Sequence, residues 1–179
     1  MRTLSPSLFS DRRWWYTLLL PLLLLGACKR DDSYAEFIEA QKKRDDAAIQ
    51  AYITQAGIPA ASIERRESGL YIVRKVAGTG PQVLNGKNVQ AKYIGKFLDG
   101  RRFDSSYENA PAPLCQCFGF QVGAGSVIKA WDEAFLLLRK GDEVELLVPS
   151  HLGYGMNATR SIPANTPLRF EIIVTEVEQ

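Results

Sequence analysis

VQAKYIGKFLDGRRFDSS, residues 89–106, predicts a β-hairpin. Apolar and polar side chains alternate through its first half, which is the pattern of a half-buried strand. Asp99-Gly100 follows, and this dipeptide is a strong hairpin signal because the tight turns that join antiparallel strands need a positive φ. We therefore expect a strand over residues 88–97, a turn at Asp99-Gly100, and a return strand that begins at Arg101 and carries Phe103.

Similar alternation appears on both sides of this hairpin. Strand patterns cover residues 70–76, 118–120, 144–148 and 168–174. Another segment has its apolar residues at the steps of one helical face: Val127, Ile128, Trp131, Ala134, Phe135 and Leu138. Lys140-Gly141 is a suitable end for that helix, because glycine accepts the left-handed conformation that often follows a last helical turn. A single helix among strands predicts an α+β domain, in which an antiparallel sheet packs one face on the helix.

Ordered segments of this domain resemble FK506-binding-protein (FKBP) type peptidyl-prolyl isomerases, at near-family spacing. The segments are residues 89–106, Gly125–Glu133 (GSVIKAWDE), Val144–Pro149, Leu152–Gly155 (LGYG), Ile162-Pro163 and Leu168–Val177. The resemblance implies a half-barrel sheet of five or six strands wrapped on one short helix, with the active pocket between them. We place this domain at residues 68–179.

The same resemblance implies which side chains form the pocket. Catalytic roles fall on Phe103, Asp104, Trp131 and Tyr154, with Trp131 at the pocket floor. Substrate contacts fall on Tyr93, Phe118, Val127, Ile128 and Phe170, and on Ile162 at a mobile rim. Taken alone, Val127 and Phe170 favour an ordinary core position. Tyr154 is different, because it lies between two glycines in a loop where neither strand nor helix periodicity explains it.

A pocket of this kind suits proline isomerisation, a reaction that breaks no bond. An Xaa-Pro bond rotates over a barrier of ~18–20 kcal/mol because amide resonance resists twisting. An aromatic cavity that strips water from the amide favours the twisted state over the planar one. The resemblance therefore implies a peptidyl-prolyl cis/trans isomerase for proline-containing polypeptides, with no cofactor and with FK506-like macrolides as inhibitors. The alternatives are a chaperone or binding module with little turnover, and a scaffold subunit of an envelope complex.

Two departures from the family pattern concern the site. Tyr107-Glu108-Asn109 occupies the stretch where many members have an arginine that pairs with the aspartate, so the setting of Asp104 is open. Asp104 either receives the dipole of the rotating carbonyl or braces pocket side chains. Cys115 and Cys117 are too close in sequence for an unstrained bridge, which leaves free thiols or pairing with another chain.

The composition excludes several other classes of function. A net charge of +2 provides no basic stripe of the kind that nucleic-acid binding needs. The chain has three cysteines and one histidine, His151, which we interpret as an exposed loop residue. These are too few ligands for a zinc site, and they leave a single candidate base for a Ser-His catalytic system. We expect neither nucleic-acid partners nor metal chemistry.

The start of the chain resembles a bacterial lipoprotein signal. Three arginines precede an apolar run, residues 14–25, that is shorter than the ~20 residues a spanning helix needs. Leu25-Gly26-Ala27-Cys28 resembles the lipobox, in which the cysteine is lipidated and becomes the mature N-terminus. We expect a signal peptide over residues 1–27 and a membrane anchor at Cys28; a plain signal peptide or an uncleaved anchor is the alternative. Lys29 favours the outer membrane of a bacterial envelope, on its periplasmic face or at the cell surface.

Residues 28–67 are expected to join this anchor to the domain. Between Ser33 and Gly57, apolar residues recur at helical steps on both sides of a polar stretch, Gln41–Asp46. The pattern predicts short amphipathic helices that flank a solvated segment and stop at Gly57. We interpret the segment as a spacer that lifts the domain off the membrane; a homodimer formed through the N-terminal helix is the alternative.

Overall fold

The computed structural model describes residues 30–108 and 117–179. The predicted signal peptide, Cys28 and Cys115 lie outside these residues. The chain divides into two compact units, Met1–Ile38 and Glu39–Gln179, and the sheet belongs entirely to the second. Among the described helices, none has the length and apolar character needed to span a membrane.

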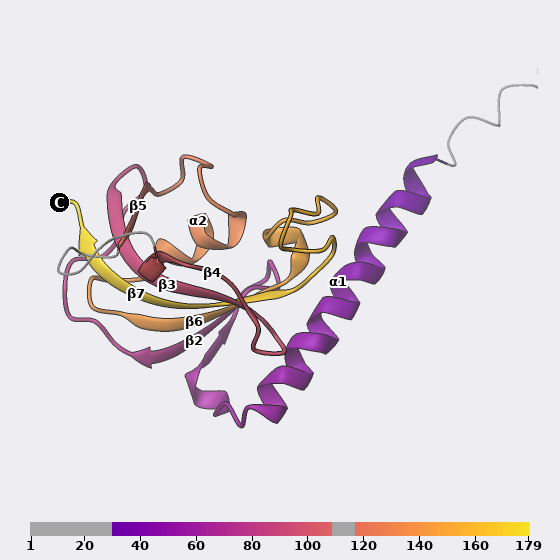
Figure 1. Cartoon of the computed structure of the whole chain (residues 1–179), viewed down its shortest axis with the longest axis horizontal. Coiled ribbons are helices and arrows are strands. Elements are labelled where there is room, and N and C mark those ends of the chain that lie inside the picture. The colour runs from indigo at the N-terminus through magenta and orange to yellow at the C-terminus, as the bar shows by residue number, and fades with distance from the viewer. Residues whose placement is uncertain (1–29, 109–116) are drawn as a thin grey trace, which may run out of the picture. The chain divides into compact units, whose positions relative to one another are not determined.

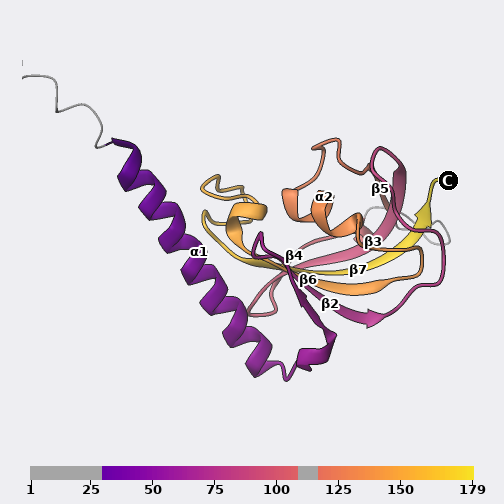
Figure 2. The same cartoon turned by 180° about the vertical axis from the view of Figure 1, so that it is seen from behind.

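An antiparallel sheet forms the frame of the second unit (Figures 1 and 2). Its strands are β1 (Ile63–Arg65), β2 (Tyr71–Val76), β3 (Asn88–Phe97), β4 (Arg102–Ser105), β5 (Phe118–Gln121), β6 (Glu143–Val148) and β7 (Leu168–Val177). The order is β1-β2-β6-β7-β3-β4, and β5 shares the outer edge of β3 with β4. The predicted α+β architecture is confirmed. The described sheet has seven strands rather than five or six, because the short β1 and β5 also pair.

The β3–β4 hairpin forms where the sequence predicts it. Gly100 has a φ of 94°, the left-handed conformation that glycine tolerates, and the N–H of Phe97 donates to the carbonyl of Arg101 at 2.9 Å. Position 95 in β3 needs a glycine for a different, steric reason. A Cβ at this position would lie 2.7 Å from the ring of Phe103, so the glycine makes room for that ring to pack beside β3.

Helix α2 (Lys129–Phe135) packs its apolar face on the inner side of the sheet. The α-helix is shorter than the apolar pattern predicts. After Phe135 the chain continues in tighter turns, in which the N–H groups of Leu137 and Leu138 donate to carbonyls three residues earlier. These turns keep Leu138 buried in the core, which explains why the apolar pattern outlasts the helix. Short 3₁₀ helices complete the fold: η1 (Ala60–Ser62), η2 (Ser106–Glu108) and η3 (Ser150–Leu152).

Helix α1 (Arg30–Gln55) is continuous, so the prediction of short helices around a solvated segment is wrong. The polar residues in its middle stay helical because they find partners on the domain. The carboxylate of Asp45 is 2% exposed and accepts hydrogen bonds from Ser150, and Asp46 accepts one from the hydroxyl of Tyr71. The second compact unit therefore begins at Glu39, upstream of the predicted domain start at Ser68.

The C-terminal half of α1 covers part of the outer face of the sheet. Ile49 is fully buried there, against a small cluster formed with Tyr71, Val73 and Leu147. Successive side chains of a strand point to opposite faces, and Ile72 between Tyr71 and Val73 belongs to the inner core with α2. The two helices therefore pack on opposite faces of the sheet.

A buried carboxylate joins α1 to this outer face. Glu145 on β6 is 3% exposed and accepts hydrogen bonds from the Tyr52 hydroxyl at 2.7 Å and from Arg169 at 2.9 Å, while Lys75 lies 3.1 Å away. Burial alone would raise the pKa of Glu145, but these three donors outweigh it and hold the pKa below its ordinary value. Burial and the adjacent carboxylate raise the pKa of Tyr52 to about 12.

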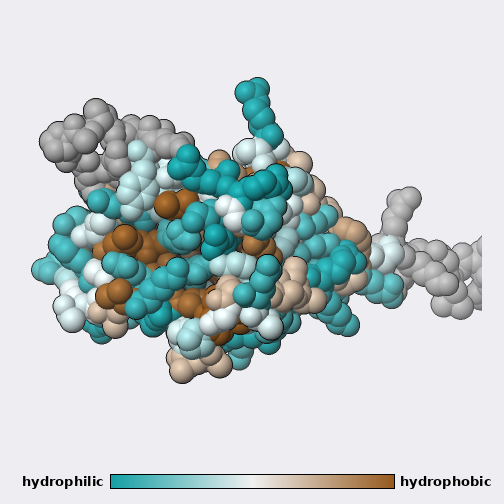
Figure 3. Space-filling model, turned by 60° about the horizontal axis from the view of Figure 1, so that its bottom comes forward, coloured by the Kyte–Doolittle hydropathy of each residue, from teal (hydrophilic) through white to brown (hydrophobic). Residues whose placement is uncertain are grey.

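Figure 3, which turns the bottom of Figure 1 forward, shows the surface of the molecule, on which hydrophobic residues form small groups separated by hydrophilic ones.

Candidate active site

A cavity of about 620 Å³ opens on the inner side of the sheet, between β3, β5, β7, α2 and the loop after η3. Its lining consists of Tyr93, Asp104, Phe118, Gly125, Ser126, Val127, Ile128, Lys129, Trp131, Asp132, Gly153, Tyr154 and Phe170. Every site residue expected from the sequence lies in this lining except Phe103 and Ile162, and Cys28, which falls outside the described residues. The fold therefore brings together residues from segments far apart in the chain.

Trp131 of α2 lies at the centre of an aromatic cluster. Its ring is 4% exposed and meets Tyr93 edge-on at 5.0 Å and Phe170 edge-on at 5.5 Å between ring centroids. Aromatic rings prefer this arrangement because the positive edge of one faces the negative face of the other. Within the described residues, no acceptor reaches the buried indole N–H of Trp131. The cluster forms a rigid, apolar floor.

The carboxylate of Asp104 is oriented by a hydrogen bond from a tyrosine. The hydroxyl of Tyr93 donates to Oδ2 of Asp104 at 2.7 Å, and the backbone N–H of Ser105 donates to Oδ1 at 2.8 Å. Burial first, and then the hydrogen bond and negative charge of Asp104, raise the pKa of Tyr93 well above its usual range. Tyr93 therefore stays a protonated donor that orients the carboxylate, which answers the question that the sequence left open about the setting of Asp104.

Tyr154 reaches the cavity from the turn that follows η3. The carbonyl of Ser150 accepts hydrogen bonds from the N–H groups of Gly153 at 3.0 Å and Gly155 at 2.8 Å, and these bonds close the turn around Tyr154. Gly155 has a φ of 59°, which suits glycine. Burial and the nearby charge of Asp104 raise the pKa of Tyr154, so its hydroxyl is protonated. Among the described residues the hydroxyl has no hydrogen-bond partner, which leaves it available to a substrate.

The loop before α2 supplies lining residues that the sequence reasoning missed. Asp132, in the first turn of α2, accepts hydrogen bonds from the backbone N–H groups of Gly123 at 2.8 Å and Gly125 at 3.1 Å. These bonds fix the path of the chain through Ser126 to Ile128 along the cavity wall. An acidic residue in the first turn of a helix was the available signal, since carboxylates are stabilised near unpaired N–H groups.

Phe103 and Ile162 are not among the lining residues of the cavity. Phe103 packs edge-on against Phe170, a lining residue, with 5.7 Å between ring centroids. Ile162 is 3% exposed and belongs to the core instead of a mobile rim. The reason is a local turn in which Thr159 and Ile162 exchange hydrogen bonds, Thr159 N–H to Ile162 carbonyl and Ile162 N–H to Thr159 Oγ1. This turn directs the isoleucine side chain inward.

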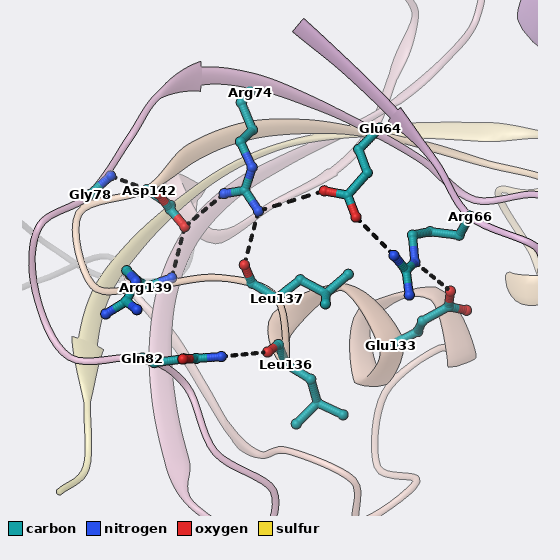
Figure 4. Close-up of polar contacts among 10 residues, drawn as sticks. All are labelled: Glu64, Arg66, Arg74, Gly78, Gln82, Glu133, Leu136, Leu137, Arg139 and Asp142. Atoms are coloured by element: carbon teal, nitrogen blue, oxygen red, sulfur yellow. Dashed lines mark hydrogen bonds and ion pairs between the residues drawn. The ribbon is translucent and has the colours of Figure 1, made fainter.

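Charged side chains hold the turns that follow α2, the helix that carries Trp131 (Figure 4). Arg74 on β2 donates to the carbonyl of Leu137 at 2.9 Å and to the carboxylate of Asp142 at 3.2 Å. Asp142 is 2% exposed and also accepts hydrogen bonds from two backbone N–H groups. A buried carboxylate with this many donors is compensated for its lost hydration. The network therefore fixes the helix beneath the cavity.

The other residues considered for chemistry do not form a metal centre in the described part of the chain. No group of three or more His, Cys, Asp or Glu side chains gathers there in a way that would hold a metal ion. His151 is only partly exposed, with Nε2 3.0 Å from the carbonyl of Ser68. Cys117 takes part in a disulfide, so it is not a free thiol.

The cavity lies within a segment that matches a known protein family. A family model described as FKBP-type peptidyl-prolyl cis-trans isomerase matches residues 80–175, which include every residue of the cavity lining. FK506-binding protein 4 of Neurospora crassa is 38% identical over 110 residues, which make up 62% of this chain and 22% of that protein. The chain spans about a quarter of the length of the curated relatives of this kind.

Two solved structures share the fold. A peptidyl-prolyl cis-trans isomerase from Pseudomonas syringae pv. tomato is 31% identical, with a TM-score of 0.58 over 74% of this chain and 95% of that chain. FkpA from Escherichia coli is 24% identical, with a TM-score of 0.63 over 82% of this chain and 65% of that chain. Since the family model covers more than half of the chain and all of the cavity, this chain belongs to the FKBP-type peptidyl-prolyl cis-trans isomerase family.

Proposed function

We propose that this protein catalyses cis/trans isomerisation of Xaa-Pro bonds in polypeptide substrates. The observation that carries the proposal is the cavity itself, an aromatic floor at Trp131 flanked by the unpartnered hydroxyl of Tyr154 and the hydrogen-bonded pair of Tyr93 and Asp104. The floor suits a prolyl ring, and the polar groups at its sides suit the carbonyls that flank it.

The geometry supports a mechanism without covalent chemistry. Uncatalysed rotation about an Xaa-Pro bond takes tens to hundreds of seconds, and turnover in milliseconds requires roughly 6 to 7 kcal/mol less barrier. Burial against Trp131 and Phe170 removes water from the substrate amide, which favours the twisted state because its carbonyl has lost resonance charge. The Tyr154 hydroxyl donates a hydrogen bond to a neighbouring substrate carbonyl and holds the peptide in place.

Asp104 acts through its orientation in this proposal. Tyr93 and the N–H of Ser105 hold the two carboxylate oxygens, so the negative charge faces the cavity at a fixed position. Two roles follow from this arrangement: the carboxylate braces the pocket side chains, or its negative charge interacts with the dipole of the rotating carbonyl. Replacing Asp104 by asparagine keeps the shape and removes the charge, so a large loss of kcat in Asp104→Asn favours the electrostatic role over bracing.

FK506-like macrolides are the proposed inhibitors. The relatives include FK506-binding proteins, and the cavity of this chain offers the apolar floor and flanking polar groups described above. Titration of the full chain with FK506 should give saturable binding by calorimetry and lose isomerase activity in parallel. Inhibition that never saturates, or no heat of binding, would remove this part of the proposal.

The lipid anchor is a proposal that rests on the sequence alone. The short apolar run before Leu25–Cys28 supports cleavage and lipidation at Cys28, which would hold the enzyme in a bacterial envelope near exported proteins. We predict that Cys28→Ser abolishes incorporation of labelled palmitate and moves the protein from the membrane to the soluble fraction. Protein that stays in the membrane pellet after an alkaline wash would contradict this anchor.

The direct test of the enzymatic proposal is cis-to-trans exchange in short Xaa-Pro peptides with the purified full chain. Wild type should accelerate exchange, and a macrolide should suppress the acceleration. The competing function is a chaperone or binding module that holds clients without turnover. A protein that suppresses aggregation of an unfolded client but leaves peptide exchange at its spontaneous rate would establish that competitor instead.

A further inference from the structure

Two residues of α1 contact the segment that carries Tyr154, although α1 lies outside the segment matched by the family model. Asp45 is 2% exposed, and its Oδ2 accepts hydrogen bonds from the N–H of Ser150 at 2.8 Å and from the Ser150 hydroxyl at 2.6 Å. Ser150 is also 2% exposed. Hydrogen bonds to a charged acceptor in a buried setting are shorter and stronger than neutral ones, so this contact holds Ser150 firmly.

Ser150 transmits this contact to Tyr154. While its N–H and hydroxyl point to Asp45, its carbonyl accepts the N–H groups of Gly153 and Gly155 on either side of Tyr154. All the polar groups of Ser150 are thus engaged, either with α1 or with the turn. A shift of Ser150 therefore moves the turn from which the Tyr154 hydroxyl reaches the cavity.

The far end of the same loop is held from the same helix. Gln41 lies one helical turn before Asp45, and its side-chain amide donates to Oδ1 of Asp45 at 2.7 Å and to the carbonyl of Asn165 at 3.2 Å. The N–H of Asn165 in turn donates to the carbonyl of Gly155 at 2.6 Å, and Asn165 itself has a φ of 54°. Hydrogen bonds thus run in a closed ring from Asp45 through Ser150, Gly155, Asn165 and Gln41 back to Asp45.

From this ring we infer that Gln41 and Asp45, which we call the α1 clamp, are positioning residues that set the place of the Tyr154 hydroxyl in the cavity. The inference rests on the proposed function, since it assigns the clamp to the residue proposed to hold the substrate carbonyl. Loops without such contacts sample several conformations, and small displacements of a catalytic donor lower the rate. Helix α1 is then part of the working enzyme.

A purely structural role would be the docking of α1 on the domain, and the chain offers a matched control for it. Asp46 follows Asp45 on the same helix, but its carboxylate accepts hydrogen bonds from the Tyr71 hydroxyl at 2.7 Å and from Arg65 at 2.8 Å. These contacts join α1 to β1 and β2 and do not involve the Tyr154 loop. Asp46→Asn therefore weakens docking and leaves the clamp in place.

The first measurement is backbone amide hydrogen exchange of the full chain, which does not depend on activity. Asp45→Ala should speed exchange at Gly153 and Gly155 by about tenfold or more relative to wild type, because it removes two hydrogen bonds to a charged group. Asp45→Asn and Gln41→Met, which keep side-chain volume, should give smaller increases at the same amides, whereas Asp46→Asn should leave them unchanged. If Asp45→Ala fails to fold, these two milder variants carry the test.

The second measurement is a double-mutant cycle on kcat/KM for a Xaa-Pro peptide. Asp45→Ala should lower kcat/KM by about threefold to tenfold in wild type, but by less than about twofold when Tyr154→Phe has already removed the hydroxyl. Equal losses in both backgrounds, or an equal loss in Asp46→Asn, would show that Asp45 only stabilises the fold and would overturn the inference. An inactive wild type would refute the proposed function, and the amide exchange would still decide whether the clamp holds the loop.

Discussion

The two faces of the sheet differ in how their polar groups are paired. On the outer face the carboxylate of Glu145 receives donors from Tyr52, Lys75 and Arg169, so its charge is fully compensated. On the inner face, the indole N–H of Trp131 and the hydroxyl of Tyr154 have no partner among the described residues. Buried polar groups are normally paired, because an unmade hydrogen bond is unfavourable. The outer face thus pairs its buried carboxylate, although the Nε of Arg169 has no partner among the described residues, while the two unpartnered donors of the inner face belong to residues that line a cavity.

The largest effect should come from the floor of the inner face. Trp131→Ala should lower the free energy of unfolding by about 3–5 kcal/mol, since it deletes a buried ring that contacts several aromatic neighbours. Phe118→Ala is a matched control in the same cavity. Its ring is 39% exposed, so it should lower stability by only about 1 kcal/mol. Denaturant unfolding followed by circular dichroism measures both, and equal losses would contradict the assigned roles.

On the outer face, the contribution of the Glu145 carboxylate to the free energy of unfolding should depend on pH. The folded-state pKa of Glu145 lies below its ordinary value of 4.5, so the ionised form stabilises the fold above that pH, and the gain disappears as pH falls through the folded pKa. Wild type should therefore be more stable than Glu145→Gln at neutral pH, and the difference should narrow below about pH 4.5. A difference that does not change with pH would contradict the ion-pair account, and kcat/KM of Glu145→Gln should match wild type.

The smallest effect is expected for the single hydroxyl at the cavity. Tyr154→Phe should lower kcat/KM by about tenfold or less, because one neutral hydrogen bond contributes ~0.5–1.5 kcal/mol. The change should not lower the free energy of unfolding, since the hydroxyl has no partner among the described residues. A clear loss of stability without loss of activity would show that Tyr154 belongs with the structural, fully paired groups.

Local signals predicted the parts of the fold that depend on neighbours in sequence. Asp99-Gly100 placed the β3–β4 turn, and alternation placed β6 and β7, because turn chemistry and strand periodicity are properties of short segments. The length of α2 was overestimated for the same reason, since the tighter turns after Phe135 continue its apolar pattern. The family resemblance, by contrast, supplied most of the site residues.

Features that depend on distant partners were not predictable from the sequence. Gln41–Asp46 looks like a solvated stretch until Ser150 and Tyr71 are placed beside it. The partner of Asp104 is Tyr93 on the neighbouring strand, which no sequence spacing identifies without the register of β3 and β4. Ile162 carries no local mark of burial, because the turn that directs it inward uses the side chain of Thr159.

The central claim is that the unpartnered groups of the inner face make an isomerase. The most direct test is the rate of cis-to-trans exchange in a Xaa-Pro peptide, measured by NMR with catalytic amounts of the full chain. The account predicts acceleration by wild type, about tenfold or less reduction in Tyr154→Phe, and unchanged acceleration by Glu145→Gln on the opposite face. Exchange at the spontaneous rate with folded wild-type protein would contradict the claim.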